Sequence, residues 1–137
     1  MNLEPSFSIL GDVPPLLAKA FFGLKRAFTL GPLELQYLRD ENQGFNLIDV
    51  RAARDFKKGH APQAVNLPEE RWTRGAEALS KDIMSVFCGY SGLCPLAARA
   101  AVHFAEMGYP VMEMEGGFEA WQDHLLEVVS ENDPRAA

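Results

Sequence analysis

Two hydrophobic patterns alternate along this chain. Short apolar runs of branched or aromatic residues between turn residues are typical of buried strands. Longer stretches with apolar residues three or four positions apart are typical of helices that bury one face. The strand pattern covers residues 27–29, 45–50, 65–67, 83–87 and 111–114. The helical pattern covers residues 13–23, 31–42, 53–58, 95–107 and 118–129.

The alternation of strands and helices predicts an α/β fold, with a mostly parallel sheet covered by helices on both faces. Ligands of such sheets bind outside the carboxyl ends of the strands. Two predicted strands end in residues with useful chemistry. Asp49 and Arg51 stand at the end of one, and Cys88 follows another. We therefore expect a candidate site where these two strand ends meet.

Apolar stripes mark the first and the last predicted helix. The first stripe consists of Leu16, Leu17, Ala20, Phe21 and Leu24. Stripes of this kind usually pack against their own domain, which is the arrangement we predict. The alternative is a contact with a partner, including a homodimer through the first helix. In the last helix, the spacing predicts a core position for Phe118, Trp121 and Leu125.

Length and composition describe a single folded unit. The chain has 137 residues, of which 47% are hydrophobic and 23% charged, so a disordered chain is excluded. No apolar run is long enough for a membrane span, and the net charge of −6 argues against nucleic acid as a partner. We predict an N-terminal extension over residues 1–26, a domain over 27–129 and a disordered tail over 130–137.

The sequence also gives an expected compartment. Its first residues have no basic segment and are interrupted by prolines, so they resemble neither a secretory signal nor a transit peptide. We expect a cytoplasmic protein whose two cysteines are free thiols. Between residues 51 and 81 there are seven Lys or Arg and four acidic residues. This mildly basic stretch would favour a small anion at a nearby site.

Cys88 stands in a setting that favours a reactive thiol. It follows a buried strand and precedes a glycine-containing loop that ends where a helix begins at Pro95. Loop amides and a helix amino end lower the pKa of a thiol by stabilising the thiolate. We therefore expect Cys88 to be more acidic than a free cysteine. The alternative is a small buried residue at a strand end. The loop itself consists of Gly89, Tyr90, Ser91, Gly92, Leu93 and Cys94.

Two segments resemble the signatures of rhodanese-like domains. The first is NLIDVRAARDFKKGHAPQAVNLP, and the second is MSVFCGYSGLCPLAARAAVHFAEMGYPVMEMEGGFEAW. The resemblance as a whole covers about residues 27–125. The resemblance implies a five-stranded, mostly parallel sheet between two layers of helices. It also implies a sulfurtransferase without a cofactor, which takes sulfane sulfur from a small anionic donor such as thiosulfate and passes it to a thiol acceptor.

The resemblance assigns roles to individual residues. It implies that Cys88 bears the persulfide and that the amides of residues 89–94 cradle its outer sulfur. It implies that Asp49 and Arg51 tie neighbouring loops together, and that His60, after Gly59, fixes a further loop.

The loop after Cys88 departs from the family pattern. It is longer than usual, with Leu93 at the fifth position, where an arginine is frequent, and Cys94 at the sixth. Rhodanese-like phosphatases need an arginine at that point to hold a phosphoryl group, so phosphatase activity is disfavoured here. Arg99 lies further along the helix, and we expect it to be solvated.

Two other functions remain open. Cys88 and Cys94 could form a dithiol that cycles with a disulfide, or the chain could be a non-catalytic module that binds a partner through its first helix. A metal is not expected, because the cysteines and the histidines lack the spacing of a metal site. The histidines are His60, His103 and His124.

Overall fold

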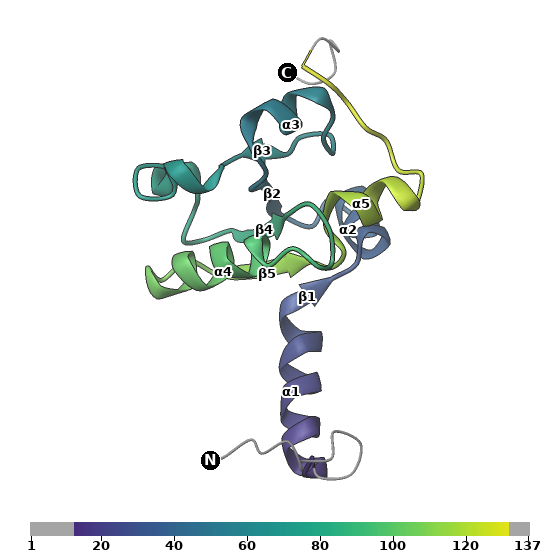
Figure 1. Ribbon diagram of the computed structural model, residues 1–137, viewed down its shortest axis with the longest axis vertical. Helices are drawn as coiled ribbons and strands as arrows, with labels where there is room; N and C mark the ends of the chain where they lie inside the picture. The colour runs from purple at the N-terminus through teal and green to yellow at the C-terminus, as the bar shows by residue number, and fades with distance from the viewer. Residues whose placement is uncertain (1–12, 132–137) are drawn as a thin grey trace, which may run out of the picture.

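The computed structural model describes residues 13–131 and has an open sheet between two layers of helices (Figure 1). The five strands lie in the order β1-β5-β4-β2-β3, and every neighbouring pair is parallel. The α/β fold predicted from the sequence is therefore confirmed, with a sheet that is parallel throughout. The strands are β1 Thr29–Leu30, β2 Phe45–Asp49, β3 Val65–Asn66, β4 Met84–Cys88 and β5 Val111–Met114.

Helices lie before, between and after the strands, and those between strands form the crossovers that parallel pairing requires. They are α1 Pro15–Phe28, α2 Pro32–Asp40, α3 Ala53–Lys58, α4 Leu96–Glu106 and α5 Gly117–Asp123, with short 3-10 turns at Glu69–Arg71 and Ala76–Ala78. None of the helices in this described part is long and apolar enough to cross a membrane.

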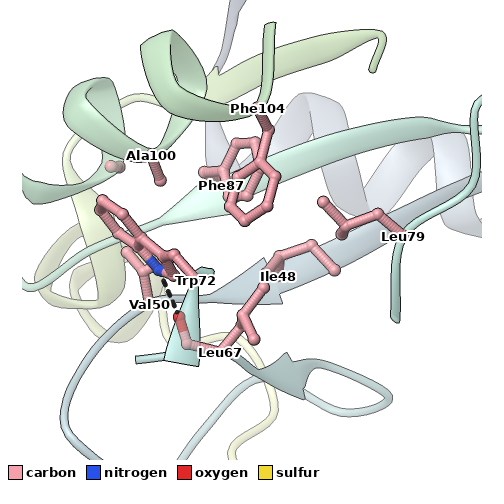
Figure 2. Packing of buried hydrophobic residues seen from close by; sticks show 9 residues of the cluster. Ile48, Val50, Leu67, Trp72, Leu79, Phe87, Ala100 and Phe104 are labelled. Carbon is pink, nitrogen blue, oxygen red and sulfur yellow. Dashed lines mark hydrogen bonds between the residues drawn. The ribbon is translucent and has the colours of Figure 1, made fainter. Parts of the chain in front are cut away.

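One face of the sheet packs against α4. Phe87 of β4 stacks on Phe104 of α4, with ring centroids 5.6 Å apart, and Ile48 of β2 belongs to the same buried cluster (Figure 2). Trp72 closes this cluster, and its indole N–H donates to the carbonyl oxygen of Leu67 at 2.9 Å. The chain between β3 and β4 is thereby fixed over the same face.

The opposite face packs against α2 and α5. Leu47 and Val86 from the two central strands meet Leu35 of α2 and Trp121 of α5 in a second buried cluster. Cys88 belongs to this cluster, because side chains two residues apart in a strand share a face. Its thiol therefore lies on the α5 side of the sheet, and α4 covers the other side.

Two ends of the predicted elements differ from the structure. Ala27 and Phe28 belong to α1, so the first strand is confined to Thr29 and Leu30. The last helix ends at Asp123, and the prediction of a core position for Leu125 is wrong: its φ is 56° and it is 91% exposed. Beyond that turn the chain crosses to His60, where Val129 forms an antiparallel bridge.

The prediction that the first helix packs on its own domain is also wrong. α1 extends away from the sheet, and the large side chains of its apolar stripe are more than half exposed (Figure 1). At the other end of the chain, Glu131 donates its backbone N–H to the carbonyl oxygen of Lys57 at 3.0 Å. Residues 1–12 of the predicted extension and 132–137 of the predicted tail lie outside the described residues.

Candidate active site

Cys88 and Asp49 lie side by side at the carboxyl edge of the sheet. They are paired residues of the neighbouring strands β4 and β2, and both are 2% exposed. The thiol of Cys88 donates to the carbonyl oxygen of Gly89 at 3.5 Å. The expected meeting of the two strand ends is therefore present, and it is closed to solvent in this conformation.

Asp49 and Arg51 form a buried ion pair beside the thiol. The guanidinium donates from Nε to Oδ1 at 3.0 Å and from Nη2 to Oδ2 at 2.8 Å. Nη2 also donates to the carbonyl oxygen of Gly59 at 2.7 Å, and the guanidinium carbon lies 4.0 Å from the centre of the Phe118 ring. These contacts join β2 to the loop after α3 and to α5. Arg51 thus serves here as a link between elements.

Two further residues tie this frame together. The side-chain amide of Asn66 donates to the carbonyl oxygens of Asp49 and Arg51, each at 3.0 Å. Sequence reasoning assigned no role to Asn66. His60 is buried, with Nδ1 2.7 Å from the carbonyl oxygen of Phe56 and its ring stacked on Phe56 at 3.7 Å. His60 therefore secures the end of α3 and the bridge to Val129.

The loop after Cys88 is held by the first residues of α5. The backbone N–H of Phe118 donates to the carbonyl oxygen of Gly89 at 2.8 Å, and that of Glu119 to the carbonyl oxygen of Tyr90 at 3.0 Å. Gly117 permits this approach. Its φ is 63°, and a Cβ there would lie only 2.7 Å from the backbone nitrogen of Ser91.

Tyr90 fastens the same loop to the start of α3. Its hydroxyl accepts the backbone N–H of Ala52 at 3.0 Å and donates to Oδ2 of Asp55 at 2.5 Å. The hydrogen bond lowers the pKa of Asp55, and burial followed by the same bond raises the pKa of Tyr90. The loop is thus attached to α5 by its backbone and to α3 by a side chain.

The tip of the loop faces solvent. Leu93 is 97% exposed, and Cys94 is partly exposed at the entrance to α4. The backbone N–H groups of Leu93 and Cys94 donate to Oγ and the carbonyl oxygen of Ser91, at 3.3 and 3.2 Å. These two amides close a local turn. In this conformation they are therefore not directed at a sulfur atom on Cys88.

The structure does not bear out the expected acidity of Cys88. Burial raises the pKa of its thiol, the Asp49 carboxylate raises it further, and Arg51 lowers it by less. The sequence argument relied on the amino end of α4, but Cys88 shares the face of Val86 and points to the other layer. In this closed conformation the thiol is protonated at neutral pH.

Comparison with known proteins gives the family. The model of the rhodanese-like domain matches residues 32–124, and the chain belongs to this family. Its sheet and helices are arranged as in a single rhodanese-like domain.

Three relatives illustrate the likeness. The adenylyltransferase and sulfurtransferase UBA4 of Candida albicans is 28% identical over an alignment of 108 residues, and the alignment covers 72% of this chain and 24% of that protein. The chain thus spans about a quarter of that relative. The BH2092 protein of Bacillus halodurans has a TM-score of 0.76 and 26% identity, covering 90% and 92% of the two chains. A rhodanese-like domain protein of Staphylococcus aureus has a TM-score of 0.66 and 22% identity, covering 75% and 99%.

A first prediction concerns the attachment of the loop by Tyr90. The substitution Tyr90→Phe removes the hydroxyl that bonds Ala52 and Asp55, so the loop should open more often. We expect a neutral alkylating reagent to modify Cys88 roughly fivefold faster. Loss of one ordinary hydrogen bond raises the population of the open loop by about this factor, and the alkylation rate follows that population. Peptide mass spectrometry against time measures the rate at each cysteine separately.

The control for this variant is Tyr109→Phe. Tyr109 donates its hydroxyl to the carbonyl oxygen of Ala76 and precedes β5, at the opposite end of the sheet from Cys88. The same atom is lost there, yet the rate at Cys88 should not change. Equal acceleration in the two variants would contradict a specific role for Tyr90.

A second prediction follows from the raised pKa of Cys88. An unfolded cysteine ionises near pH 8.5, whereas the buried thiol keeps its proton. Above about pH 8.5 the unfolded state therefore binds fewer protons, and the free energy of unfolding should fall as pH rises. Urea unfolding at several pH values measures this slope. In Cys88→Ala the slope should be shallower, and an identical slope in both proteins would contradict the raised pKa.

Proposed function

We propose that this chain is a sulfurtransferase that carries sulfane sulfur as a persulfide on Cys88. The observation that supports this most is a free thiol at the carboxyl end of a central strand, beside the ion pair of Asp49 and Arg51. Ligands of open α/β sheets bind at this edge. Membership of the rhodanese-like family and the likeness to a protein named as a sulfurtransferase point the same way.

The proposed reaction has two balanced steps. The thiol loses its proton to solvent, and the thiolate attacks the outer sulfur of a donor such as thiosulfate. The donor's S–S bond breaks, sulfite leaves with the electron pair, and a persulfide remains on Cys88. The thiolate of an acceptor then attacks the outer sulfur. This forms a persulfide on the acceptor and returns the Cys88 thiolate.

Both steps require the loop of residues 89–94 to move. Cys88 is closed to solvent, and its protonated form is favoured by burial. Opening the loop would let water reach the sulfur, which reduces the desolvation that raises the thiol's pKa. The exposed side chains of Arg54, Lys57 and Lys58 on α3 would attract an anionic donor to this side of the molecule.

Two alternatives each have one observation in their favour. The buried, protonated thiol favours a module that binds partners without catalysis. The presence of a second, partly exposed thiol in the same loop favours a dithiol that cycles with a disulfide. The sulfurtransferase is preferred because its reaction needs only the one free cysteine at the strand end, whereas the dithiol also needs Cys94. The three functions give different masses in one experiment.

A third prediction is the uptake of one sulfur atom from thiosulfate. After incubation and removal of excess donor, the intact mass of the wild-type chain should increase by one sulfur, and cyanide should remove it. Cys88→Ser should abolish the uptake, whereas Cys94→Ser, the matched change in the same loop, should retain part of it. Uptake by Cys88→Ser together with no uptake by Cys94→Ser would place the persulfide on Cys94 and contradict the assignment to Cys88.

The alternatives appear as other outcomes of the same measurement. A loss of two hydrogens after mild oxidation, dependent on both cysteines, together with no sulfur uptake would favour the dithiol. No change with either reagent, even in Tyr90→Phe, would favour the non-catalytic module.

A fourth prediction excludes phosphoryl transfer. Residues 89–94 contain no cation, and Arg99 of α4 is paired with Glu69. A transferring phosphoryl group needs positive charge on its oxygens, so hydrolysis of an aryl phosphate should not exceed that of Cys88→Ser. Release of the phenol by the two proteins, compared side by side, measures this. Faster hydrolysis by the wild type would contradict the proposed reaction class.

A further inference from the structure

The apolar face of α1 is uncovered. Leu17, Phe21, Leu24 and Phe28 follow one another at the spacing of a single helix face, and each is more than half exposed. α1 meets the sheet near its last turn, where Nζ of Lys25 lies 3.8 Å from a carboxylate oxygen of Glu115. A helix of 14 residues is only marginally stable in water without packing. A surface that covers this face would therefore stabilise α1.

A second apolar surface lies between β1 and α2. Leu30, Leu33, Tyr37 and Leu38 line a shallow groove of about 360 Å³, together with Glu34. This groove is close to α1 along the chain, but α1 cannot turn back to fill it. The helix ends at Phe28 and the strand begins at Thr29, so no loop allows a reversal (Figure 1).

We propose that the chain forms a two-fold symmetric dimer in which α1 of each copy lies in the groove between β1 and α2 of the other. In this exchange the apolar face of α1 in one copy covers the groove of the other copy. The two-fold axis repeats this contact once, so the assembly is closed at two copies. Two helix-in-groove contacts can then approach the roughly 1,200 Å² that specific interfaces bury.

The charges favour a second copy as the occupant. α1 carries Lys19, Lys25 and Arg26 and no acidic residue, whereas the whole chain has a net charge of −6. Glu34 of α2 lines the groove, and α2 carries one further acidic residue, Asp40, and one basic residue, Arg39. The basic helix of one copy therefore complements the carboxylate at the groove and the overall negative charge of the other copy. An anionic lipid surface would attract α1 but repel the acidic remainder of the chain.

The likeness to one solved structure reaches the part of the chain that contains α1. The alignment with BH2092 of Bacillus halodurans covers 90% of the chain, which is more than the segment from residue 32 to the C-terminus contains. The structural likeness therefore extends into α1, beyond the part that the family model matches.

The test compares two neighbouring phenylalanines in the full chain. Phe21 is 57% exposed on the stripe, and Phe22 is 56% exposed on the other side of α1, between Lys19 and Arg26. Sedimentation velocity over a wide concentration range should show the wild type and Phe22→Glu approaching twice the monomer mass. Phe21→Glu should weaken dimerisation at least roughly tenfold, because it places a charge in the apolar contact.

Mixing two defective variants distinguishes the exchange from a simple pairing of two α1 helices. Leu33→Glu damages the groove, so alone it should be monomeric, as should Phe21→Glu. A mixture contains one intact contact, formed by α1 of the Leu33→Glu copy in the groove of the Phe21→Glu copy, and should form heterodimers. No heterodimer in the mixture, with the dimer retained by Leu33→Glu, would assign the contact to paired helices and overturn the proposal.

Other outcomes also decide the matter. A wild-type chain that is monomeric at every concentration overturns the dimer, and its binding to vesicles of phosphatidylserine and phosphatidylcholine would then assign the stripe to a membrane surface. Equal loss of dimer in Phe21→Glu and Phe22→Glu would show that the stripe is not the contact. Cys88→Ser should dimerise like the wild type, so this test is independent of sulfur transfer.

Discussion

The buried ion pair of Asp49 and Arg51 is the interaction on which the arrangement of the site depends. It lies where β2 ends, and the guanidinium reaches the carbonyl oxygen of Gly59 and the ring of Phe118. Removing one partner of such a pair typically costs about 3–5 kcal/mol, because the other charge stays buried without compensation. Phe118 in turn donates a backbone hydrogen bond to the cysteine loop. The position of the loop is thus coupled to the ion pair through α5.

The strands around this pair could be predicted from the sequence because each carries its own local signal. The apolar runs that end at Asp49 and Cys88 are bounded by turn residues, and parallel pairing then places the two ends together. The contacts of Asn66 and Tyr90 had no such signal. Each bonds a backbone group that is distant along the chain and that only the folded topology brings near. The face on which Cys88 lies follows from strand alternation, which the sequence argument did not apply to it.

The two ends of the chain differ from the prediction for related reasons. Apolar periodicity shows that a helix has an apolar face, but it does not show which surface covers that face. In α1 the large apolar side chains stay exposed and do not pack against the chain's own domain. Near the C-terminus, the apolar residues after Asp123 continue the periodic pattern. There the antiparallel bridge between Val129 and His60 requires an extended segment, so the helix stops and Leu125 takes a positive φ.

The site combines a rigid frame with a cover that is held more weakly. The bonds of the frame are buried and include a charged pair, whereas those of the loop are two backbone hydrogen bonds to α5 and the partly exposed contacts of Tyr90. Local opening breaks only the bonds that hold the loop, so it requires less free energy than unfolding the domain. A thiol under such a cover is protected from alkylation and oxidation while the loop is closed. An opening that broke only these weaker bonds would leave the buried pair of Asp49 and Arg51 intact, and it would expose the Cys88 thiol at the end of a strand that stays paired.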